Sequence, residues 1–344
     1  MKKKIVAILL AITLCFSISL TGCRVDNSDS GKKETSKNGS SNELKNVKIS
    51  AINAISWAPV FVAKTEGFYG KEGLNVEFTT PGGPKGFQAM HAGDCDFAML
   101  SQEPLLIAQE KGMESKVIAS TLKTRVYGLV SSSEIKDIKG LKGKKVFASD
   151  PGSAPYIFTS NVLSMEGIDP LKDVSYVQFS DQNAGLQAFL KGEVDGSFVN
   201  MYTLASAKDF KYNVLADTTK SGQSEKYLGS KDFPGEMLCT TKKFSDENPE
   251  ICQKVVNSMI NAQKWIADHS DQEVAKSLKS IFGEIDEDII AEQVKLVRNE
   301  FNKSCKVSKD GQKAVVDMAI KAGIISKEIP YDEIIDMKYV NSYK

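Results

Sequence analysis

Two periods of hydrophobic and polar residues follow one another along residues 47–100, and together they predict an order of strands and helices. Residues 47–52 alternate apolar and polar side chains, as a half-buried strand does. A helix is expected to begin at Pro59, because proline fits the first helical turn, where its missing N–H costs little. The next predicted elements are a strand at 74–78, a helix at 85–92 closed by Gly93, and a strand at 97–100. Strands that alternate with helices predict a parallel sheet.

The same order of elements returns further along the chain. Strands are predicted at residues 145–148, 174–179 and 197–199, and helices at about 154–166 and 186–191. Two further strand patterns, at residues 127–131 and 237–241, connect the two regions. We therefore expect an α/β protein of two lobes, the first made of residues 47–130 and 237–344 and the second of residues 131–236.

Two stretches of the chain repeat one another. Residues 86–96 and 185–195 place Gly, Gln, Ala, Gly and Asp at the same spacing, and Ala58-Pro59 upstream matches Ala154-Pro155. The matched residues are Gly86, Gln88, Ala89, Gly93 and Asp96 against Gly185, Gln187, Ala188, Gly192 and Asp195. Such a repeat indicates two similar halves, and paired halves commonly enclose a ligand. A protein that binds a small molecule in a cleft is the first hypothesis.

The chain after the second lobe is mainly helical. Ser245 or Asp246 can cap a helix whose apolar residues recur at a spacing near 3.6. These residues are Ile251, Val255, Met259, Ala262 and Ile266. Further helices are predicted at about 272–281, 287–302 and 309–323. Residues 331–344 are expected to wrap over the fold as the end of this helical extension.

The first 46 residues predict export. Three lysines precede an apolar run at residues 5–20, which is short for a membrane span and typical of a signal peptide. The run ends in Leu20-Thr21-Gly22-Cys23, which resembles the bacterial lipobox, whose cysteine carries lipid after cleavage. We expect a signal peptide at 1–22, a lipid on Cys23, a flexible polar tether at 23–46, and a place on the extracytoplasmic face of the cell membrane. An ordinary signal peptide or a short anchor helix is the alternative.

Charge and cysteine content narrow the classes of function. The chain has 44 basic and 44 acidic residues, so removal of a signal peptide with three lysines leaves a net charge of −3. Nucleic-acid binding needs a basic face, and we expect none. The cysteines after Cys23 are Cys95, Cys239, Cys252 and Cys305. They could pair in three ways, but free buried thiols are favoured over disulfides.

At this point the chain resembles a known family, the solute-binding lipoproteins of ABC importers for sulfonates, nitrate, taurine and thiamine-pyrimidine precursors. The resemblance covers roughly residues 47–270. Its motifs are Trp57-Ala58-Pro59, Glu66-Gly67-Phe68-Tyr69, Glu72-Gly73-Leu74-Asn75-Val76, Gly82-Gly83, Ala92-Gly93-Asp94-Cys95-Asp96, Leu141-Lys142-Gly143 and Gly192-Glu193-Val194-Asp195. It implies a bilobal periplasmic-binding fold of the two-crossover type, capture of a solute by lobe closure, and delivery to a permease with its ATPase subunit. We expect a monomer.

Candidate ligand-binding residues follow from the strand order, because ligands of doubly wound sheets bind beyond the carboxyl ends of the strands. The candidates are Ser56, Trp57, Gly82, Gly83, Gln102, Glu103, Ser153, Tyr156, Asn183, Asn200 and Tyr202. Trp57 could stack on a ligand or be a packing residue, and Gly82 and Gly83 could offer amides or simply form a turn. Ser153 could hold an anion or cap a helix. Glu103 could pair with a ligand amine or be a solvated carboxylate.

Catalysis and metal binding are not expected. His91, Asp94, Cys95 and Asp96 resemble a metal cluster, but the repeat replaces His91 and Cys95 with Leu190 and Val194. The sequence contains neither a G-x-S-x-G nucleophile motif nor a glycine-rich nucleotide motif. We therefore predict no catalytic residue, no metal and no cofactor.

The leading interpretation is a membrane-tethered receptor for an ABC importer. An enzyme similar to the pyrimidine-precursor synthases that share this architecture, and a lipoprotein that senses a ligand, are the alternatives. Two ligand classes remain open, a small sulfonate or nitrate-type anion and a pyrimidine-like heteroaromatic solute. The scarcity of arginine and the presence of Glu103 favour the heteroaromatic solute.

Overall fold

The fold is described from a computed structural model, for residues 44–207 and 209–344. All helices, strands and buried clusters given below belong to one compact unit, Asn42–Lys344. The predicted signal peptide, the lipidation site Cys23 and the tether up to residue 43 lie outside the described residues. Among the described helices, none has both the length and the apolar character required to cross a membrane.

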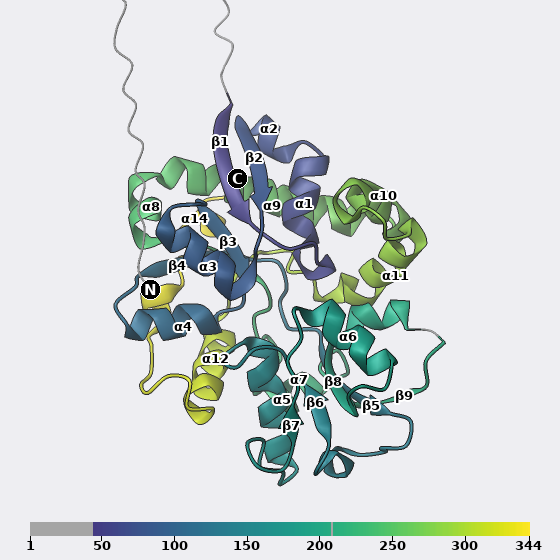
Figure 1. The fold of residues 1–344 in the computed structure, drawn as a ribbon. Coiled ribbons are helices and arrows are strands. Elements are labelled where there is room, and N and C mark those ends of the chain that lie inside the picture. Colours follow the sequence, from purple (N-terminus) through teal and green to yellow (C-terminus); the bar gives the residue numbers. More distant parts are fainter. Residues whose placement is uncertain (1–43, 208) are drawn as a thin grey trace, which may run out of the picture. The chain divides into compact units, whose positions relative to one another are not determined.

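The first sheet has five strands in the order β2-β1-β3-β10-β4 (Figure 1). The strands are β1 (Lys45–Ser50), β2 (Leu74–Thr79), β3 (Phe97–Leu100), β4 (Ser115–Ser120) and β10 (Met237–Thr241). β1 is parallel to β2 and β3, whereas β10 is antiparallel to β3 and β4. The prediction of a parallel sheet is therefore wrong at β10, because this strand enters the sheet after the chain returns from the second one.

The second sheet repeats this arrangement in the order β7-β6-β8-β5-β9. The strands are β5 (Tyr127–Ser132), β6 (Lys145–Phe147), β7 (Ser175–Tyr176), β8 (Gly196–Asn200) and β9 (Tyr212–Asp217). β6 is parallel to β7 and β8, and β5 is antiparallel to β8 and β9. Strand β5 thus takes the place that β10 has in the first sheet. By sheet membership residues 127–130 belong with the second sheet, although the predicted first lobe included them.

The sequence repeat corresponds to a repeated structural unit. Helices α3 (Gly83–Ala92) and α6 (Gln182–Leu190) are each followed by a glycine with positive φ, +85° at Gly93 and +73° at Gly192. The carboxylate of Asp96 accepts a hydrogen bond from the backbone N–H of Lys48 at 2.8 Å. Asp195 accepts one from Lys145 at 2.9 Å in the same position of the second sheet. The two-halves prediction is confirmed at the level of single hydrogen bonds.

The first glycine of each repeat allows a helix to lie directly on the end of a strand. A Cβ atom added at Gly86 would be 2.2 Å from the Ser50 hydroxyl at the end of β1. One added at Gly185 would be 2.2 Å from a ring carbon of Phe147 at the end of β6. Real Cβ atoms do not approach other atoms so closely, so α3 and α6 need glycine at these positions to keep their distance from the strands.

The remaining helices of the two halves join the sheets through continuous apolar packing. They are α1 (Ala58–Thr65), α2 (Phe68–Lys71), α4 (Glu103–Glu110), α5 (Ala154–Met165) and α7 (Gln223–Leu228). Pro59 and Pro155 lie in the first turns of α1 and α5, as predicted. One buried cluster extends from α4, beside the first sheet, to α5, beside the second. The two sheets therefore share a core in this conformation.

The C-terminal helices are α8 (Lys242–Glu247), α9 (Pro249–Asp268), α10 (Asp271–Phe282), α11 (Glu287–Val297) and α12 (Lys309–Lys321). The predicted apolar face of α9 is buried. The predicted cap is wrong, because Ser245 and Asp246 lie inside the short helix α8, whose own cap is Thr241. Helix α9 begins at Pro249 instead. Helix α12 contacts α4 on one side and α5 and α7 on the other, so it bridges the two halves.

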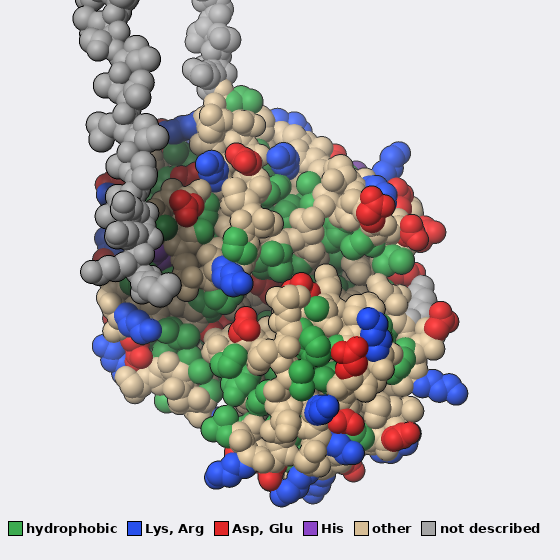
Figure 2. Space-filling view, in the orientation of Figure 1, with side chains coloured by type: hydrophobic (Ala, Val, Ile, Leu, Met, Phe, Trp, Pro, Cys, Tyr) green, Lys and Arg blue, Asp and Glu red, His purple; other side chains and the backbone are tan. Residues whose placement is uncertain are grey.

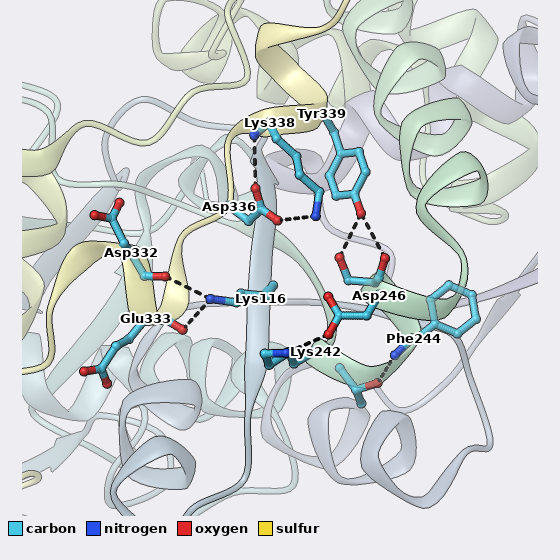
Figure 3. A network of polar contacts seen from close by, with 11 residues as sticks. Lys116, Lys242, Phe244, Asp246, Asp332, Glu333, Asp336, Lys338 and Tyr339 are labelled. Carbon is cyan, nitrogen blue, oxygen red and sulfur yellow. Dashed lines mark hydrogen bonds and ion pairs between the residues drawn. The ribbon is translucent and has the colours of Figure 1, made fainter.

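The C-terminal segment covers the exposed edge of β4, as the wrap prediction required. It contains α13 (Tyr331–Ile334) and α14 (Lys338–Asn341). The Lys116 ammonium group on β4 donates to the carbonyls of Asp332 and Glu333, both at 2.9 Å (Figure 3). Ile335 forms a β-bridge with Val117. An open strand edge is a site for unwanted pairing between chains, and this segment closes it.

The cysteines that follow residue 43 are all free thiols. Cys95, Cys239, Cys252 and Cys305 are buried. Burial raises the pKa of Cys95 to about 11 and that of Cys252 likewise to about 11. The preference for buried thiols over disulfides is confirmed for these four residues.

Candidate solute-binding site

The carboxyl ends of the strands in both sheets meet at the two crossovers. Residues 121–126 lead from the end of β4 to the start of β5, and residues 233–236 lead into β10. Met237 at the start of β10 pairs with Leu100 at the end of β3, and Tyr127 at the start of β5 pairs with Asn200 at the end of β8. Each crossover is therefore attached to the carboxyl edge of a sheet. The predicted ligand loops lie along these same edges.

Direct contacts join the two edges. The hydroxyl of Ser56 lies 3.3 Å from that of Tyr202, which belongs to the 3-10 turn Met201–Ser206 after β8. A Cβ atom at Gly152, in the loop before α5, would be 3.9 Å from the side chain of Ile107 on α4. Figure 2 shows a recess on this face between the parts that contain the two sheets, with acidic and basic side chains interspersed around it. The structure thus has the two halves in contact.

Trp57 is a packing residue of the first loop. Its side chain is 4% exposed, and a Cβ atom at Gly82 would lie 2.8 Å from two carbons of its six-membered ring. Gly82 therefore lets the indole lie against the loop that follows β2. Gly83, with φ of +64° and open space around its Cα, is left accessible at the start of α3. Of the two interpretations of Trp57, packing against Gly82 is the one that these contacts explain.

Glu103 is engaged by the protein itself. Its two carboxylate oxygens accept hydrogen bonds from Arg125, at 2.6 and 2.9 Å, and both side chains are at most 2% exposed. Arg125 also donates to the carbonyl of Pro234 at 3.2 Å and lies over the ring of Phe233. Burial alone would lower the pKa of Arg125, but Glu103 raises it above its usual value. The expectation that Glu103 offers a carboxylate to a ligand amine is therefore wrong, because Arg125 already occupies both oxygens.

Glu236 is a carboxylate at the carboxyl edge of the first sheet. It directly precedes β10, so the antiparallel register puts it beside Ser101 at the end of β3. It is half-buried, and burial raises its pKa, while Arg125 and a hydrogen bond from the Trp57 indole act to lower it. Since Arg125 is paired with Glu103, the charge of Arg125 is already largely balanced by Glu103. Sequence reasoning missed Glu236, although the predicted strand at 237–241 marked the position one residue later.

Two of the predicted residues on the second sheet are held by capping and packing contacts. The hydroxyl of Ser153 accepts the backbone N–H of Tyr156 at 3.4 Å and so caps α5. The ring of Tyr156 lies 4.9 Å from that of Tyr176. Capping is therefore the interpretation of Ser153 that a contact supports.

The two predicted asparagines and Tyr202 differ in what they present. The amide of Asn200 donates to the side chain of Gln182 at 2.7 Å, and Asn183 is exposed. Tyr202 is 4% exposed, and burial raises its pKa while the bond to Ser56 lowers it. Asn183 is thus free to meet solvent, the amide nitrogen of Asn200 is engaged by Gln182, and Tyr202 serves the contact between the halves.

Gln102 is fully buried, and among the described residues neither its amide nitrogen nor its carbonyl oxygen has a hydrogen-bond partner. It stands between Ser101 and Glu103 at the start of α4. Buried amides are almost always satisfied, so an unpaired one calls for a polar partner that the described part of the chain does not supply. Among the candidates, Gln102 is therefore the one whose unsatisfied amide is best explained by a hydrogen bond to a ligand or to water.

Three acidic side chains lie at or next to these strand ends. Glu236 is joined by Asp150, after β6, and Asp181, which caps α6; both of these are exposed. Lys85 near the start of α3 is the exposed cation of the neighbouring loops. Ser149, between β6 and Asp150, adopts φ of +66°, a conformation that non-glycine residues rarely take and that clusters at binding sites.

The comparisons with known proteins agree with this fold. The sequence profile described as NMT1/THI5 like matches residues 54–273. A Bacillus subtilis protein named as an aliphatic sulfonates-binding protein is 26% identical over 351 residues, or 99% of this chain and 96% of the relative. The alkanesulfonate-binding protein SsuA from Xanthomonas axonopodis pv. citri, solved with bound MOPS, superposes with a TM-score of 0.67 at 16% identity, over 86% of this chain and 98% of that one.

A shorter similarity leads to an enzyme. The 4-amino-5-hydroxymethyl-2-methylpyrimidine phosphate synthase of Schizosaccharomyces pombe is 28% identical over 141 residues, which is 40% of this chain and 39% of the synthase. The similarities that span almost the whole chain are to binding proteins. With the profile covering most of the folded part, the chain belongs to the NMT1/THI5-like family and is a solute-binding protein with a bilobal periplasmic-binding fold.

Proposed function

We propose that this protein is the lipid-anchored receptor of an ABC importer for a small nitrogen-containing solute, an aminopyrimidine or a similar heteroaromatic amine. The observation that supports it best is Glu236, a half-buried carboxylate at the carboxyl edge of the first sheet. A carboxylate in this position can accept hydrogen bonds from an amine or a protonated ring nitrogen. Its raised pKa reflects the cost of burying a charge that a cationic ligand would offset.

An anionic solute is less compatible with the same residues. A sulfonate or nitrate at this edge would approach Glu236 while Arg125, the nearby cation, is occupied by Glu103. Backbone amides at the start of α3, next to Gly83, are the groups that could still bind an anion. The relative named for sulfonates and the neighbour solved with MOPS make an anion the competing ligand class.

Anchoring and transport complete the proposal. Cys23 after cleavage would hold the receptor on the extracytoplasmic face of the membrane, with the predicted tether 23–46 between the lipid and the fold. The solute would bind more tightly to the closed arrangement than to the open one, and binding would therefore shift the two halves toward closure. The closed receptor, as a monomer, would then dock on a permease that works with an ATPase subunit. The lipobox and the family of binding proteins support these steps.

The test is a binding titration that follows the fluorescence of Trp57. The full chain in detergent carries Trp265→Phe, which leaves Trp57 as the single tryptophan. The panel contains thiamine, 5-aminomethyl-4-amino-2-methylpyrimidine, taurine, ethanesulfonate and nitrate. We expect the aminopyrimidines to bind and Glu236→Gln to weaken them about ten-fold or more, as loss of a hydrogen bond to a charged group does. Glu134→Gln, an exposed change at the other end of β5, is the matched control and should leave binding unchanged.

The pH dependence gives a second readout of the same carboxylate. Because burial raises the pKa of Glu236, binding of a permanently cationic solute such as thiamine should weaken as the pH falls through that raised value. Glu236→Gln should abolish this dependence. If ethanesulfonate or nitrate binds and Glu236→Gln makes it bind more tightly, the receptor takes an anion and the proposed ligand class is refuted.

A further inference from the structure

A second cavity lies at the hinge, apart from the solute site. Its volume is about 830 Å³, and it is bounded by both crossovers and by the C-terminal helices. Lys123 belongs to the first crossover, Pro234 to the second, and Gln263 to α9. Arg298 follows α11, and Lys306 precedes α12. The cavity contains none of the candidate residues at the strand ends, so we call it the hinge cavity and treat it as a separate site.

The walls of the hinge cavity are fastened to both crossovers. In the first crossover, the N–H of Lys123 donates to the carbonyl of Glu300 at 2.9 Å, and Leu122 forms a β-bridge with Phe301. In the second, a Cβ atom at Gly311 of α12 would be 2.0 Å from the carbonyl oxygen of Asp232, so the two segments touch. The cavity is therefore enclosed between the C-terminal helices and the two segments that connect the halves.

The charge of the hinge cavity is positive. Four basic side chains line it, from Lys123, Arg298, Lys303 and Lys306, against the single carboxylate of Asp232. Arg298 is paired with Asp271 at 2.5 Å, and Lys123 lies 3.7 Å from Glu300. Lys303 and Lys306 are exposed and take part in none of the ion pairs within residues 44–207 and 209–344. Their charges are therefore available to an anion.

Two residues that line the cavity each have a buried polar atom with no hydrogen-bond partner in residues 44–207 and 209–344. The Nη2 of Arg298 is an unused donor, because Nε binds Asp271 and Nη1 binds the carbonyl of Ile266. The Oε1 of Gln263 is an unused acceptor, since only its Nε2 is engaged, by the carbonyl of Thr121 at 2.8 Å. Gln263 is 1% exposed. Unsatisfied buried groups of this kind are costly, and one donor and one acceptor together match a ligand that has both functions.

We propose that the hinge cavity binds a small hydroxycarboxylate anion and that this anion regulates closure of the two halves. Its carboxylate interacts with Arg298, Lys303 and Lys306, and its hydroxyl donates to Gln263. An anion held between the two crossovers binds the open and the closed arrangement with different affinities, so it changes the affinity for the solute in the recess. The binding step stands by itself, whereas the regulatory step rests on the solute receptor proposed above.

Isothermal titration calorimetry of the full chain in detergent tests the binding step with L-malate and succinate as probes. We expect L-malate to bind, succinate to bind at least five-fold more weakly because it lacks the hydroxyl, and Lys303→Gln/Lys306→Gln to weaken L-malate at least five-fold. Both lysines are exposed, so the variant should fold. Lys276→Gln/Lys295→Gln removes two equally exposed charges from α10 and α11 and should behave as the wild type. Equal affinity in the two double variants, or equal binding of succinate and L-malate, overturns the proposal.

The regulatory step has a readout that needs no cleft solute. Spin labels on exposed positions of the two halves, at Glu77 on β2 and Lys191 after α6, report the distance between them by electron–electron resonance. Saturating L-malate should change the distribution of distances in the wild type and leave it unchanged in Lys303→Gln/Lys306→Gln. If L-malate binds by calorimetry but the distribution does not move, the regulatory role is refuted while the site stands. Failure of the aminopyrimidine titration affects neither measurement.

Discussion

The Glu103–Arg125 pair holds two opposite charges where water does not reach. Both oxygens of Glu103 and both terminal nitrogens of Arg125 are used, and the guanidinium lies between Phe233 and Tyr127. A buried charge is expensive when its partner is removed, because the remaining ion keeps its desolvation cost without compensation. This pair therefore holds the start of α4 against the first crossover. Its role is to position these two segments rather than to add net stability.

Removal of one partner should show this cost directly. Glu103→Gln is expected to lower the free energy of unfolding by about 3–5 kcal/mol, because the Arg125 charge would remain buried alone. The double variant Glu103→Gln/Arg125→Met should recover most of the loss. Chemical denaturation monitored by circular dichroism gives both values. A loss below about 1 kcal/mol in the single variant would mean that Arg125 finds water or another partner.

At the residue scale, the sequence could predict the strand ends at which we propose the site, but not which way the side chains there point. The ends of β1, β2 and β8 lie where the sequence predicts them to within two residues, whereas the assignment of Trp57, Gly82 and Asn200 to a ligand stays a prediction. The direction in which a side chain points depends on packing that the sequence does not show, and Ser153 therefore proved to be a helix cap. Glu236 could not be recognised, because its place beside Ser101 depends on the antiparallel register of β10.

At the scale of elements, the repeat was the most reliable signal. Its glycines and aspartates act through local hydrogen bonds and close approaches that are the same in both halves. Strands β4 and β9 were not predicted, since short apolar runs do not distinguish a strand from a buried helix. The antiparallel direction of β5 and β10 could not be predicted from the sequence either. It depends on the side from which the chain enters each sheet, and no local pattern of residues shows this.

The close approach of α6 to β6 can be tested with one methyl group. Gly185→Ala would place a Cβ atom 2.2 Å from the Phe147 ring, so the helix must move or the ring must turn. We expect a loss of about 1–3 kcal/mol in the free energy of unfolding, the usual cost of overpacking. Gly70→Ala, on α2 with open space around it, should be neutral or slightly stabilising. Equal effects of the two changes would contradict the role given to Gly185.

At the scale of the whole compact unit, the two halves are held together by a small number of polar contacts over a shared apolar core. The Ser56–Tyr202 contact is one of these, and it connects the loop after β1 to the turn after β8. A neutral hydrogen bond contributes about 0.5–1.5 kcal/mol. An energy of that size is enough to shift an equilibrium between open and closed arrangements without locking it.

Tyr202→Phe should therefore move the ligand-free protein toward the open arrangement. The expected change in the closed-to-open ratio is about two- to ten-fold, from the loss of one hydrogen bond. Small-angle X-ray scattering would record it as a larger radius of gyration. Tyr69→Phe is the matched control, because its buried hydroxyl on α2 has no hydrogen-bond partner in the part of the chain that the structure describes, and it should leave the radius unchanged. An unchanged radius in Tyr202→Phe would show that the apolar core alone sets the arrangement.

The position of β10 in the middle of the first sheet also determines the order in which the protein can be assembled. The second sheet is built from one uninterrupted stretch, Tyr127–Asp217, so it can form as soon as that stretch is free to fold. The first sheet cannot, because β3 and β4 are joined only through β10, which lies more than a hundred residues further along. Closing the long loop between β4 and β10 is slow, so β3 and β4 would keep unpaired edges until β10 is added. The second sheet lies in the sequence between β4 and β10 of the first sheet. Once folded, it is thus expected to bring these two strands close together so that they can pair.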